Sequence, residues 1–373
     1  MRSPPDPDNI RVVLNPKSSG NVYLDIPYAE LRRLSLSPSR LLHYFCFIIL
    51  GLEGTIHTED ERVIALEGND DEEKEDQNVG LKPGYTYLYH TENPFTSALV
   101  DSEAAHKLTS LDSTSSQERG GEFRSRLVDR DGFGIFTGQI PDLCAGQHII
   151  PHIKGDAWLN LIVQSRRHCD TEEISGGIDD PRNGFLDSGT LRKCLATRRV
   201  LIIKTPNNYL RPEDLPPAVP RPGIPPQCSF PTNCRFTLMW AFGNAVPYGL
   251  GFQMPADAAF VSPNADDLPS GLLLDCYNAG VISEKYLKGF EELSSHPFPR
   301  PPSIDRPPRP SDTAYRSKQD GGDADELCFD ADDPCDVILR IWMMSGNAQK
   351  RHERKQRELR ERINSWNSAT ENG

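Results

Sequence analysis

Apolar and polar positions follow different periods along the chain, and each change of period marks the edge of a predicted element. From Ile10 to Ile26 short apolar groups alternate with turn formers, which predicts two strands joined by an Asn-Pro/Ser-Gly turn. Residues 29–34 are a candidate for a short helix. The apolar run from Leu41 to Leu52 predicts a buried helix or strand, and it is too short to span a bilayer.

The middle of the chain alternates candidate strands and helices, with glycine-rich turns between them. Strands are marked by β-branched and aromatic runs, and helices by apolar residues three and four positions apart. The elements that these patterns predict are, in order, a strand at Phe133–Thr137, a strand at Gly146–Ile153, a helix at Ala157–Arg167, a helix that carries Leu191 and Leu195 and is capped by Asp187 or Ser188, and a strand at Val200–Ile203.

Several stretches lack such periodicity and are interpreted as loops or linkers. The acidic tract at residues 67–80 predicts a solvated loop. Two proline-rich stretches, at residues 211–233 and 296–325, predict extended linkers on either side of an apolar segment at 236–260. Residues 336–366 combine an apolar stripe with charges spaced i,i+4, which predicts one long helix with a solvated end.

Composition and charge narrow the classes of function. Hydrophobic residues make up 37% of the chain, which also holds 32 Pro and 28 Gly, so part of its length is expected to be linker. A net charge of −13 argues against a protein that coats nucleic acid along its whole surface. A local patch remains, because residues 181–211 contain seven basic side chains and one acidic one. Those assigned to phosphate contact are Arg182, Arg192, Lys193, Arg198 and Arg199.

The cysteines and the N-terminal sequence indicate in which cellular compartment the protein is expected. The nine Cys are an odd number, and no two have the CxxC spacing of a zinc ribbon. Residues 1–15 lack the basic start and apolar run of a secretory signal. We therefore expect reduced thiols in an intracellular protein, cytoplasmic or nuclear, with no membrane partner.

One stretch, GQHIIPHIKGD, places His148 and His152 four positions apart around Pro151. His148 ends a predicted strand, Asn183 follows in a loop, and a capped helix begins near Ser188. Hydrolysis of a phosphodiester at a divalent cation needs a basic His, a residue that orients it, and ligands for the cation. The order strand, loop and helix therefore predicts a site for such chemistry.

The segments RLVDRDGFGIFTG, QHIIPHIKGD and DDPRNGFLDSGTLRKCL together resemble the HNH endonuclease domain found in many fungal proteins. The resemblance covers Glu122 to Pro212, about a quarter of the chain. It implies a ββα-metal core that cleaves DNA with Mg, Mn, Ni or Zn. It also implies that His148 is the general base and that Asn183 orients it. His152 and Gln147 are then the nearby candidates for contact with the cation.

The chain departs from the family at the metal site. Arg192 stands where the family helix has its His, and Ala196 stands where it has its Asp. A guanidinium is always protonated and cannot bind a cation, although it can hold a phosphate. Three interpretations stay open. The chain is a metal-dependent endonuclease, or a catalytically inactive HNH-fold module that binds nucleic acid or protein, or an interaction scaffold that binds protein partners through the proline-rich linkers or the C-terminal helix.

The expected fold class is α+β. It consists of an HNH-like ββα-metal core with a β-containing region before it and a helical extension after it. The predicted divisions are residues 1–118, with β structure and the acidic loop; 119–215, the HNH-like domain; 216–335, proline-rich linkers and a small apolar segment; and 336–373, a charged C-terminal helix.

Overall fold

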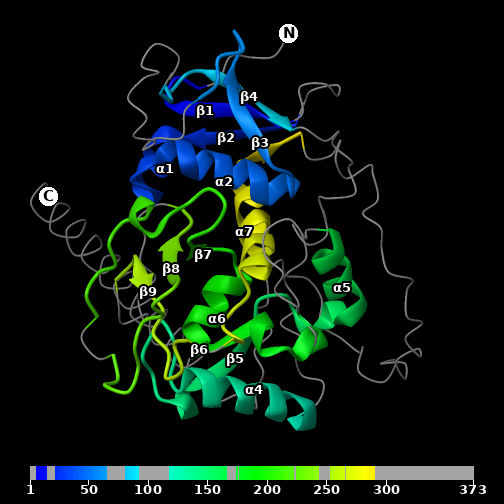
Figure 1. The fold of residues 1–373 in the computed structure, drawn as a ribbon, viewed down its shortest axis with the longest axis vertical. Helices are drawn as coiled ribbons and strands as arrows, with labels where there is room; N and C mark the ends of the chain where they lie inside the picture. Colours follow the sequence, from blue (N-terminus) through cyan, green and yellow to red (C-terminus); the bar gives the residue numbers. More distant parts are fainter. Residues whose placement is uncertain are drawn as a thin grey trace, which may run out of the picture. The chain divides into compact units, whose positions relative to one another are not determined.

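Figure 1 shows the fold of the chain, as a computed structural model. The structure describes residues 6–14, 22–64, 80–91, 117–165, 174, 176–221, 224–242, 253–264 and 266–289. All of these residues lie in one compact unit, 1–316, and a second unit comprises residues 317–373. The predicted linker at 296–325, the predicted helix at 336–366 and residues 67–79 of the acidic tract lie outside the described residues.

A five-stranded sheet forms from the N-terminal third of the chain and one short later strand. Its order is β10-β2-β1-β4-β3; β1 and β4 are parallel, and the other neighbours are antiparallel. The pairing of β1 with β2 confirms the two strands predicted between Ile10 and Ile26. The strands are β1 (Asn9–Val13), β2 (Tyr23–Pro27), β3 (Gly54–Thr58), β4 (Thr86–Thr91) and β10 (Leu287–Lys288).

Three helices pack near this sheet: α1 (Tyr28–Leu34), α2 (Pro38–Leu50) and α7 (Gly271–Tyr286). The apolar run after residue 40 is therefore helical, and every residue of α2 is buried. Gly51 ends α2 in the left-handed conformation, at φ 65°, which glycine adopts without strain. Sequence patterns did not predict α7, whose first turn is capped by the hydroxyl of Ser270.

A three-stranded antiparallel sheet, in the order β7-β8-β9, lies against α7. It comprises β7 (Val200–Thr205), β8 (Arg235–Trp240) and β9 (Ala256–Asp257). β7 confirms the predicted strand at 200–203, and its pairing with β8 crosses the domain boundary predicted after residue 215. We call the packing of α2, α7 and β7 the central core.

The first proline-rich stretch, predicted to be an extended linker, is attached to the rest of the fold along its described part. The short helix η6 (Pro212–Asp214) begins it, and Val219 N donates to the carbonyl of Pro255 at 2.8 Å. The guanidinium of Arg221 donates to the carbonyls of Phe136 and Asp257. Proline lacks an N–H to donate, so this segment is held by the few donors that its other residues supply.

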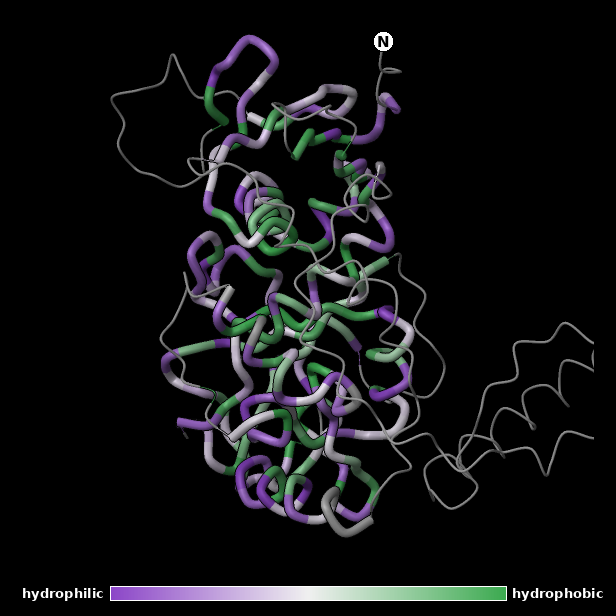
Figure 2. Tube along the Cα trace, turned by 90° about the vertical axis from the view of Figure 1, so that its right-hand side faces the viewer, coloured by the Kyte–Doolittle hydropathy of each residue, from purple (hydrophilic) through white to green (hydrophobic). Residues whose placement is uncertain are grey.

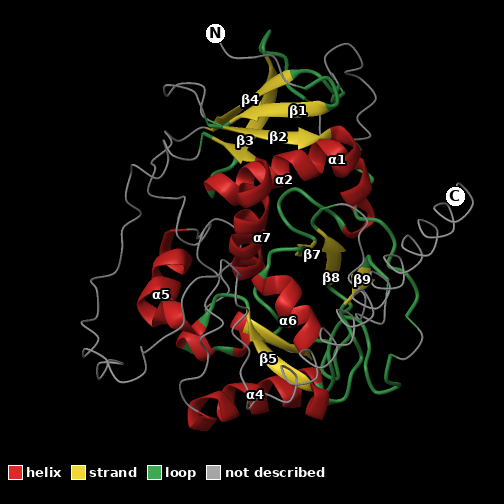
Figure 3. Cartoon of the chain, turned by 180° about the vertical axis from the view of Figure 1, so that it is seen from behind, coloured by secondary structure: helices red, strands yellow, loops and turns green. Residues whose placement is uncertain are grey.

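A two-stranded antiparallel sheet carries the candidate site. β5 (Cys144–His148) pairs with β6 (Gly184–Ser188), and α6 (Gly189–Ala196) follows directly. Figures 1 and 3 show α6 on one side of the pair and α4 (Gln117–Asp131) on the other. Ser188 caps α6 by accepting from Leu191 N at 3.2 Å, as predicted. We call this arrangement the β5–β6–α6 unit.

The two faces of the strand pair bury different clusters. Leu186 and Cys144 join Phe123 and Leu127 of α4 in a small apolar cluster. Phe185 and Leu191 belong instead to the large core, which also includes residues of α2, β7 and α7. Figure 2 shows hydrophobic stretches running through the inner part of the trace. Sequence patterns did not predict α4, because its charged residues hide the apolar positions that face the pair.

The strand predicted at Phe133–Thr137 is wrong, because these residues form a tight turn. Gly138 N donates to the carbonyl of Gly134 at 2.6 Å, and Phe136 N donates to the carboxylate of Asp187 at 2.8 Å. This turn is held by the buried carboxylate of Asp187 and by the carbonyl of Leu186 in β6, which accepts from Ile135 N at 3.0 Å. Helix α5 (Gly155–Ser165) confirms the helix predicted from residue 157.

The described residues thus form a mixed α+β fold with three sheets. None of the helices within the described ranges is long and apolar enough to cross a membrane.

Candidate functional site

His148 is the last residue of β5 and lies opposite Gly184, the first residue of β6. A side chain at Gly184 would not fit, since a Cβ there would lie 2.4 Å from the carbonyl oxygen of Gln147 and 2.6 Å from the ring of Phe123. The glycine after Asn183 is therefore needed for close approach of the strands rather than for a left-handed turn. This pairing brings the predicted base His and the predicted Asn to the same end of the strand pair.

Two neighbours fix the ring of His148. The ring stacks on Phe123 of α4, with centroids 3.9 Å apart and an interplanar angle of 11°. Its Nε2 lies 3.0 Å from Oδ1 of Asp179. An ionised carboxylate can only accept a hydrogen bond, so Nε2 carries the proton in the neutral ring and Nδ1 keeps its lone pair. The ring is therefore held in one tautomer, with Nδ1 able to accept a proton.

Burial lowers the pKa of His148 to about 4. The carboxylate of Asp179 opposes this shift, while His152 and the positive charge of Arg192 on α6 add to it. Loss of water around the charged ring is the largest cause, in keeping with a side chain that is 20% exposed. His148 is consequently a neutral imidazole at neutral pH, which is the form that a general base requires.

Asp179 is the residue of this site that sequence reasoning missed. It ends the short helix η4 (Gly177–Asp179), and its other oxygen lies 3.7 Å from Nε2 of His152 in η3 (His152–Lys154). The rings of His148 and His152 are 5.8 Å apart and inclined at 65°. The only signal in the sequence was the Asp-Asp pair before Pro181, and no spacing rule assigns one of those carboxylates to a histidine.

Asn183 does not bind the ring of His148. Its side-chain oxygen accepts from Ile150 N at 2.8 Å, and its amide nitrogen donates to the carbonyls of Ile150 at 3.0 Å and Ile178 at 2.8 Å. Asn183 is fully buried, and these three bonds use its acceptor and both of its donors. The predicted orienting role is thus indirect: Asn183 joins the backbone after His148 to the turn that carries Asp179.

Gln147 does not lie with His148, because successive side chains of a strand point to opposite faces. Gln147 is 4% exposed, and its amide nitrogen lies 3.3 Å from the carbonyl of Ala145 and 3.4 Å from that of Asp187. The amide of Gln147 therefore binds backbone carbonyls of the strand pair. Of the two predicted cation contacts, only His152 is near His148.

The basic residues predicted to contact phosphate have different environments. Arg192 and Lys193 are half-buried on α6, and Arg199 is exposed beyond its end. Arg198 is 5% exposed and donates to the carboxylate of Glu284 at 2.9 Å, so its guanidinium is bound within the fold and its contact with nucleic acid stays a prediction. Arg182 is half-buried, with Nε 3.7 Å from the carboxylate of Asp180.

A buried ionic network supports the unit behind the site. The guanidinium of Arg130 pairs with Asp131 at 2.6 Å and donates to three backbone carbonyls, those of Pro181, Gly184 and Asp267. The carboxylate of Asp131 in turn accepts from Leu186 N at 2.7 Å. Burial raises the pKa of Asp131, and the charge of Arg130 opposes that shift. The network ties α4 to the first strand residues of β6.

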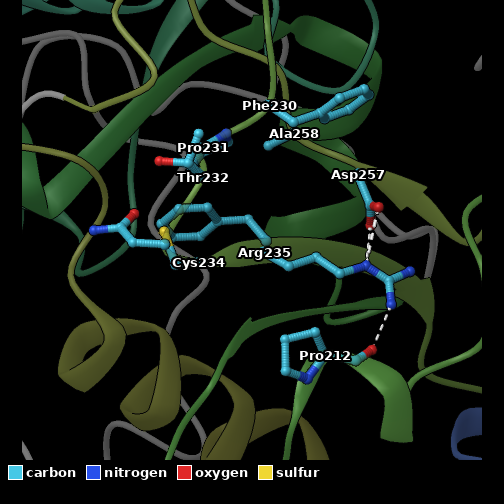
Figure 4. Close-up of a pocket in the computed structure, with 10 residues that line it drawn as sticks. Pro212, Phe230, Pro231, Thr232, Cys234, Arg235, Asp257 and Ala258 are labelled. Atoms are coloured by element: carbon cyan, nitrogen blue, oxygen red, sulfur yellow. Dashed lines mark hydrogen bonds and ion pairs between the residues drawn. The ribbon is translucent and has the colours of Figure 1, made fainter.

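A pocket of about 310 Å³ lies away from these residues, between Pro212, the segment from Phe230 to Phe236, and Asp257. Figure 4 shows the guanidinium of Arg235 directed to the carboxylate of Asp257 and to the carbonyl of Pro212. It also donates to the carbonyl of Pro216 at 2.7 Å. Arg235 thus fastens the proline-rich segment, and the pocket contains none of the predicted site residues.

Comparisons with family models, with curated proteins and with solved structures found no match for this chain. Within the ranges that the structure describes, no group of three or more His, Cys, Asp or Glu side chains is arranged to hold a metal ion.

Proposed function

We propose that the β5–β6–α6 unit is an HNH-type site that binds the phosphodiester backbone of nucleic acid, DNA or RNA, and that does so without a divalent cation. The proposal rests on one observation above the others. His148 is a neutral imidazole in a fixed tautomer, and the positive charge nearby comes from Arg192 of the helix that follows the strand pair.

Three features support an HNH-type assignment of the unit. The strand that ends in His148 pairs with the strand that follows Asn183. A helix capped by Ser188 comes directly after the second strand. Asn183 is buried between the two turns that flank the histidine. This is the order of parts that the sequence resemblance implies.

A divalent cation does not fit the residues present. The helix offers Arg192 and Ala196 in place of the family's His and Asp, and neither can be a ligand. The amide of Gln147 is engaged by strand carbonyls, and Nε2 of His148 is engaged by Asp179. A guanidinium can perform one task of the missing cation, since it binds phosphate oxygens through charge-assisted hydrogen bonds.

Binding measurements on the full chain test this proposal. Single-stranded DNA and RNA labelled with a fluorophore are titrated in EDTA and, separately, in Mg²⁺. We expect binding in both buffers, a roughly tenfold weaker Kd for Arg192→Gln, and a salt dependence that falls by about one unit of slope. Arg62→Gln is the matched control, because Arg62 is 58% exposed and pairs with Asp60 far along the chain from the unit.

Two results would contradict the proposal. Equal affinity for the wild type and Arg192→Gln would remove the guanidinium from the binding site. Binding that occurs only in Mg²⁺, accompanied by plasmid nicking that is lost in His148→Ala, would establish the metal-dependent endonuclease instead.

A further inference from the structure

The two outer edges of the β5–β6 strand pair are covered to different degrees. On the outer edge of β6, Leu186 N donates to the carboxylate of Asp131 at 2.7 Å, and the carbonyl of Leu186 accepts from Ile135 N at 3.0 Å. The carbonyl of Gly184 accepts from the guanidinium of Arg130 at 2.9 Å. The outer edge of β6 is therefore covered by its own chain.

The alternation of an antiparallel pair determines which backbone groups of β5 face outward. Ile149 N donates to the carbonyl of Asn183 at 2.8 Å, so the residue pair 149 and 183 is a hydrogen-bonded pair. Such pairs alternate along the ladder, so positions 147 and 145 also bond to β6. The backbone N–H and C=O groups at positions 144, 146 and 148 consequently point away from β6.

The open part of this outer edge consists of Gly146 and His148. At the start of β5, Cys144 N donates to the carbonyl of Pro141, and the carbonyl of Cys144 accepts from Arg124 at 3.4 Å. Within the described part of the chain, no hydrogen bond is made to the outward backbone groups of Gly146 and His148, and both residues are partly exposed. An added strand binds to such a row of outward N–H and C=O groups.

The residues around this edge favour contact with a protein. Edge strands are commonly protected from other strands by Lys, by other charges or by proline, and β5 has the sequence CAGQH, with no Lys, Arg, acidic residue or proline. Ile140 and Leu143 come just before β5, and their side chains are 52% and 48% exposed. We call Ile140, Leu143, Gly146 and His148 the β5 edge surface.

We propose that the β5 edge surface binds the same surface of a second copy of this chain, by antiparallel pairing of the two β5 strands. A twofold axis through Gln147 places Gly146 of each copy opposite His148 of the other. Every outward N–H of these residues then meets an outward C=O, so the surface is self-complementary, as a symmetric dimer requires.

The side chains fit this register as well as the backbone does. Residues opposite each other in paired strands have their side chains on the same face of the sheet. Gly146 has no side chain, which leaves room for the ring of His148 of the second copy. Leu143 is then directed to the turn that begins at Pro151 of the second copy, where its apolar surface leaves water.

The pairing joins the two strand pairs into one continuous sheet, in the order β6-β5-β5-β6. Helices already cover both faces of each strand pair, so the outer edge of β5 is the remaining place for the sheet to extend (Figure 3). The inference goes beyond the proposed function and does not rest on it, since the dimer forms without nucleic acid. Where both hold, the two nucleic-acid sites of the dimer lie on neighbouring strands.

Sedimentation velocity of the full chain, at concentrations from about 1 to 100 µM, tests the pairing. We expect the mass to rise from that of one chain to that of two. Leu143→Arg should raise the Kd of the dimer at least about tenfold, because it places a charge at the paired edge. Leu36→Arg is the matched control and should leave the Kd unchanged, because Leu36 is 63% exposed and lies between α1 and α2.

Amide hydrogen exchange identifies the surface that pairs. The N–H groups of Gly146 and His148 should exchange at least about tenfold more slowly at the concentration where the dimer forms than after dilution. Thermal unfolding first confirms that the variants fold, and Ile140→Arg takes the place of Leu143→Arg if that variant does not.

Three results would overturn the inference. The first is a single chain at every concentration, whether or not the two amides are protected. The second is a dimer with the same Kd in the folded arginine variant at the edge and in the wild type. The third is a dimer in which the exchange of the Gly146 and His148 amides does not slow, because such a dimer uses another surface. None of these results bears on the binding of nucleic acid.

Discussion

The central core and the β5–β6–α6 unit each bury a histidine, and they give it different partners. In the core, Nδ1 of His43 meets the carbonyl of Ser39 at 2.9 Å, and Nε2 accepts from Ile56 N at 3.2 Å. In the unit, Nε2 of His148 meets the carboxylate of Asp179. Burial lowers both pKa values to about 4. The lowered pKa alone therefore does not mark a functional histidine; the partner does.

The same two regions each bury an asparagine, and here the chemistry is shared. Asn278 of α7 accepts from Ile202 N at 3.1 Å and donates to the carbonyl of Ile202 at 2.8 Å, which fastens the helix to β7. Asn183 makes the same pair of bonds with Ile150. The core asparagine joins two regular elements, whereas Asn183 joins two turns on either side of His148. The structural hydrogen bonds of Asn183 therefore also fix the backbone around His148.

Of the substitutions that compare the two regions, Arg130→Ala is expected to lower the free energy of unfolding most. Arg130→Ala removes the ion-pair partner of the buried Asp131 and one donor from each of three carbonyls, so we expect a loss of about 3–5 kcal/mol of unfolding free energy. Urea denaturation measures it. Arg62→Ala, at an exposed ion pair, should leave the midpoint unchanged. A small loss at Arg130 would mean that the apolar cluster under α4 suffices to hold the unit.

Matched substitutions of the two asparagines separate a structural role from an influence on the site. Asn183→Ala and Asn278→Ala should each cost about 2–3 kcal/mol, because each leaves a buried N–H and C=O unpaired. Only Asn183→Ala should also weaken nucleic-acid binding and shift the NMR signals of His148. Equal binding by both variants at a temperature where both are folded would show that Asn183 has no influence on the site.

The smallest expected effect is the loss of unfolding free energy in acid. It can be measured for His148 and His43 in the same way. Each has a folded pKa near 4 and an unfolded value of 6.5, so below pH 6.5 the unfolded chain binds a proton that the folded chain does not. Stability is therefore complete above pH 6.5 and falls as the pH drops toward 4, by about 2 kcal/mol per histidine at pH 5. His148→Gln and His43→Gln should each flatten the curve of unfolding free energy between those pH values. A curve parallel to wild type would contradict the lowered pKa.

Hydrophobic patterning predicted elements whose apolar residues form a short run or recur with a clear spacing. These are the strand pair β1–β2, helix α1, helix α5 and strand β7, whose residues 200–203 are all buried. It missed α7, which is buried almost all round, and α4, whose apolar positions lie among many charges. The false strand after Gly132 has strand composition, but it folds into a turn in which Phe136 N donates to the buried carboxylate of Asp187 and Gly134 N donates to the carbonyl of Gln139.

The site was predictable only in part, for a similar reason. His148 and Asn183 stand out because the order of motifs places them at the ends of paired strands. The bond from His148 to Asp179 depends on how a short turn folds back, and Arg198 pairs with Glu284 of a helix that the pattern did not reveal. Contacts between residues far apart in sequence decide which charged groups stay available, and a single sequence does not encode them by spacing.

Calorimetric titration of Mg²⁺, Mn²⁺, Ni²⁺ and Zn²⁺ into the full chain asks whether the guanidinium of Arg192 has replaced the cation of the proposed HNH-type site. We expect the same heats for the wild type and His148→Ala. We expect additional binding in the double variant Arg192→His/Ala196→Asp, which restores two ligand types on α6. A cation that binds to the wild type and no longer binds to His148→Ala would show that the site still uses a metal.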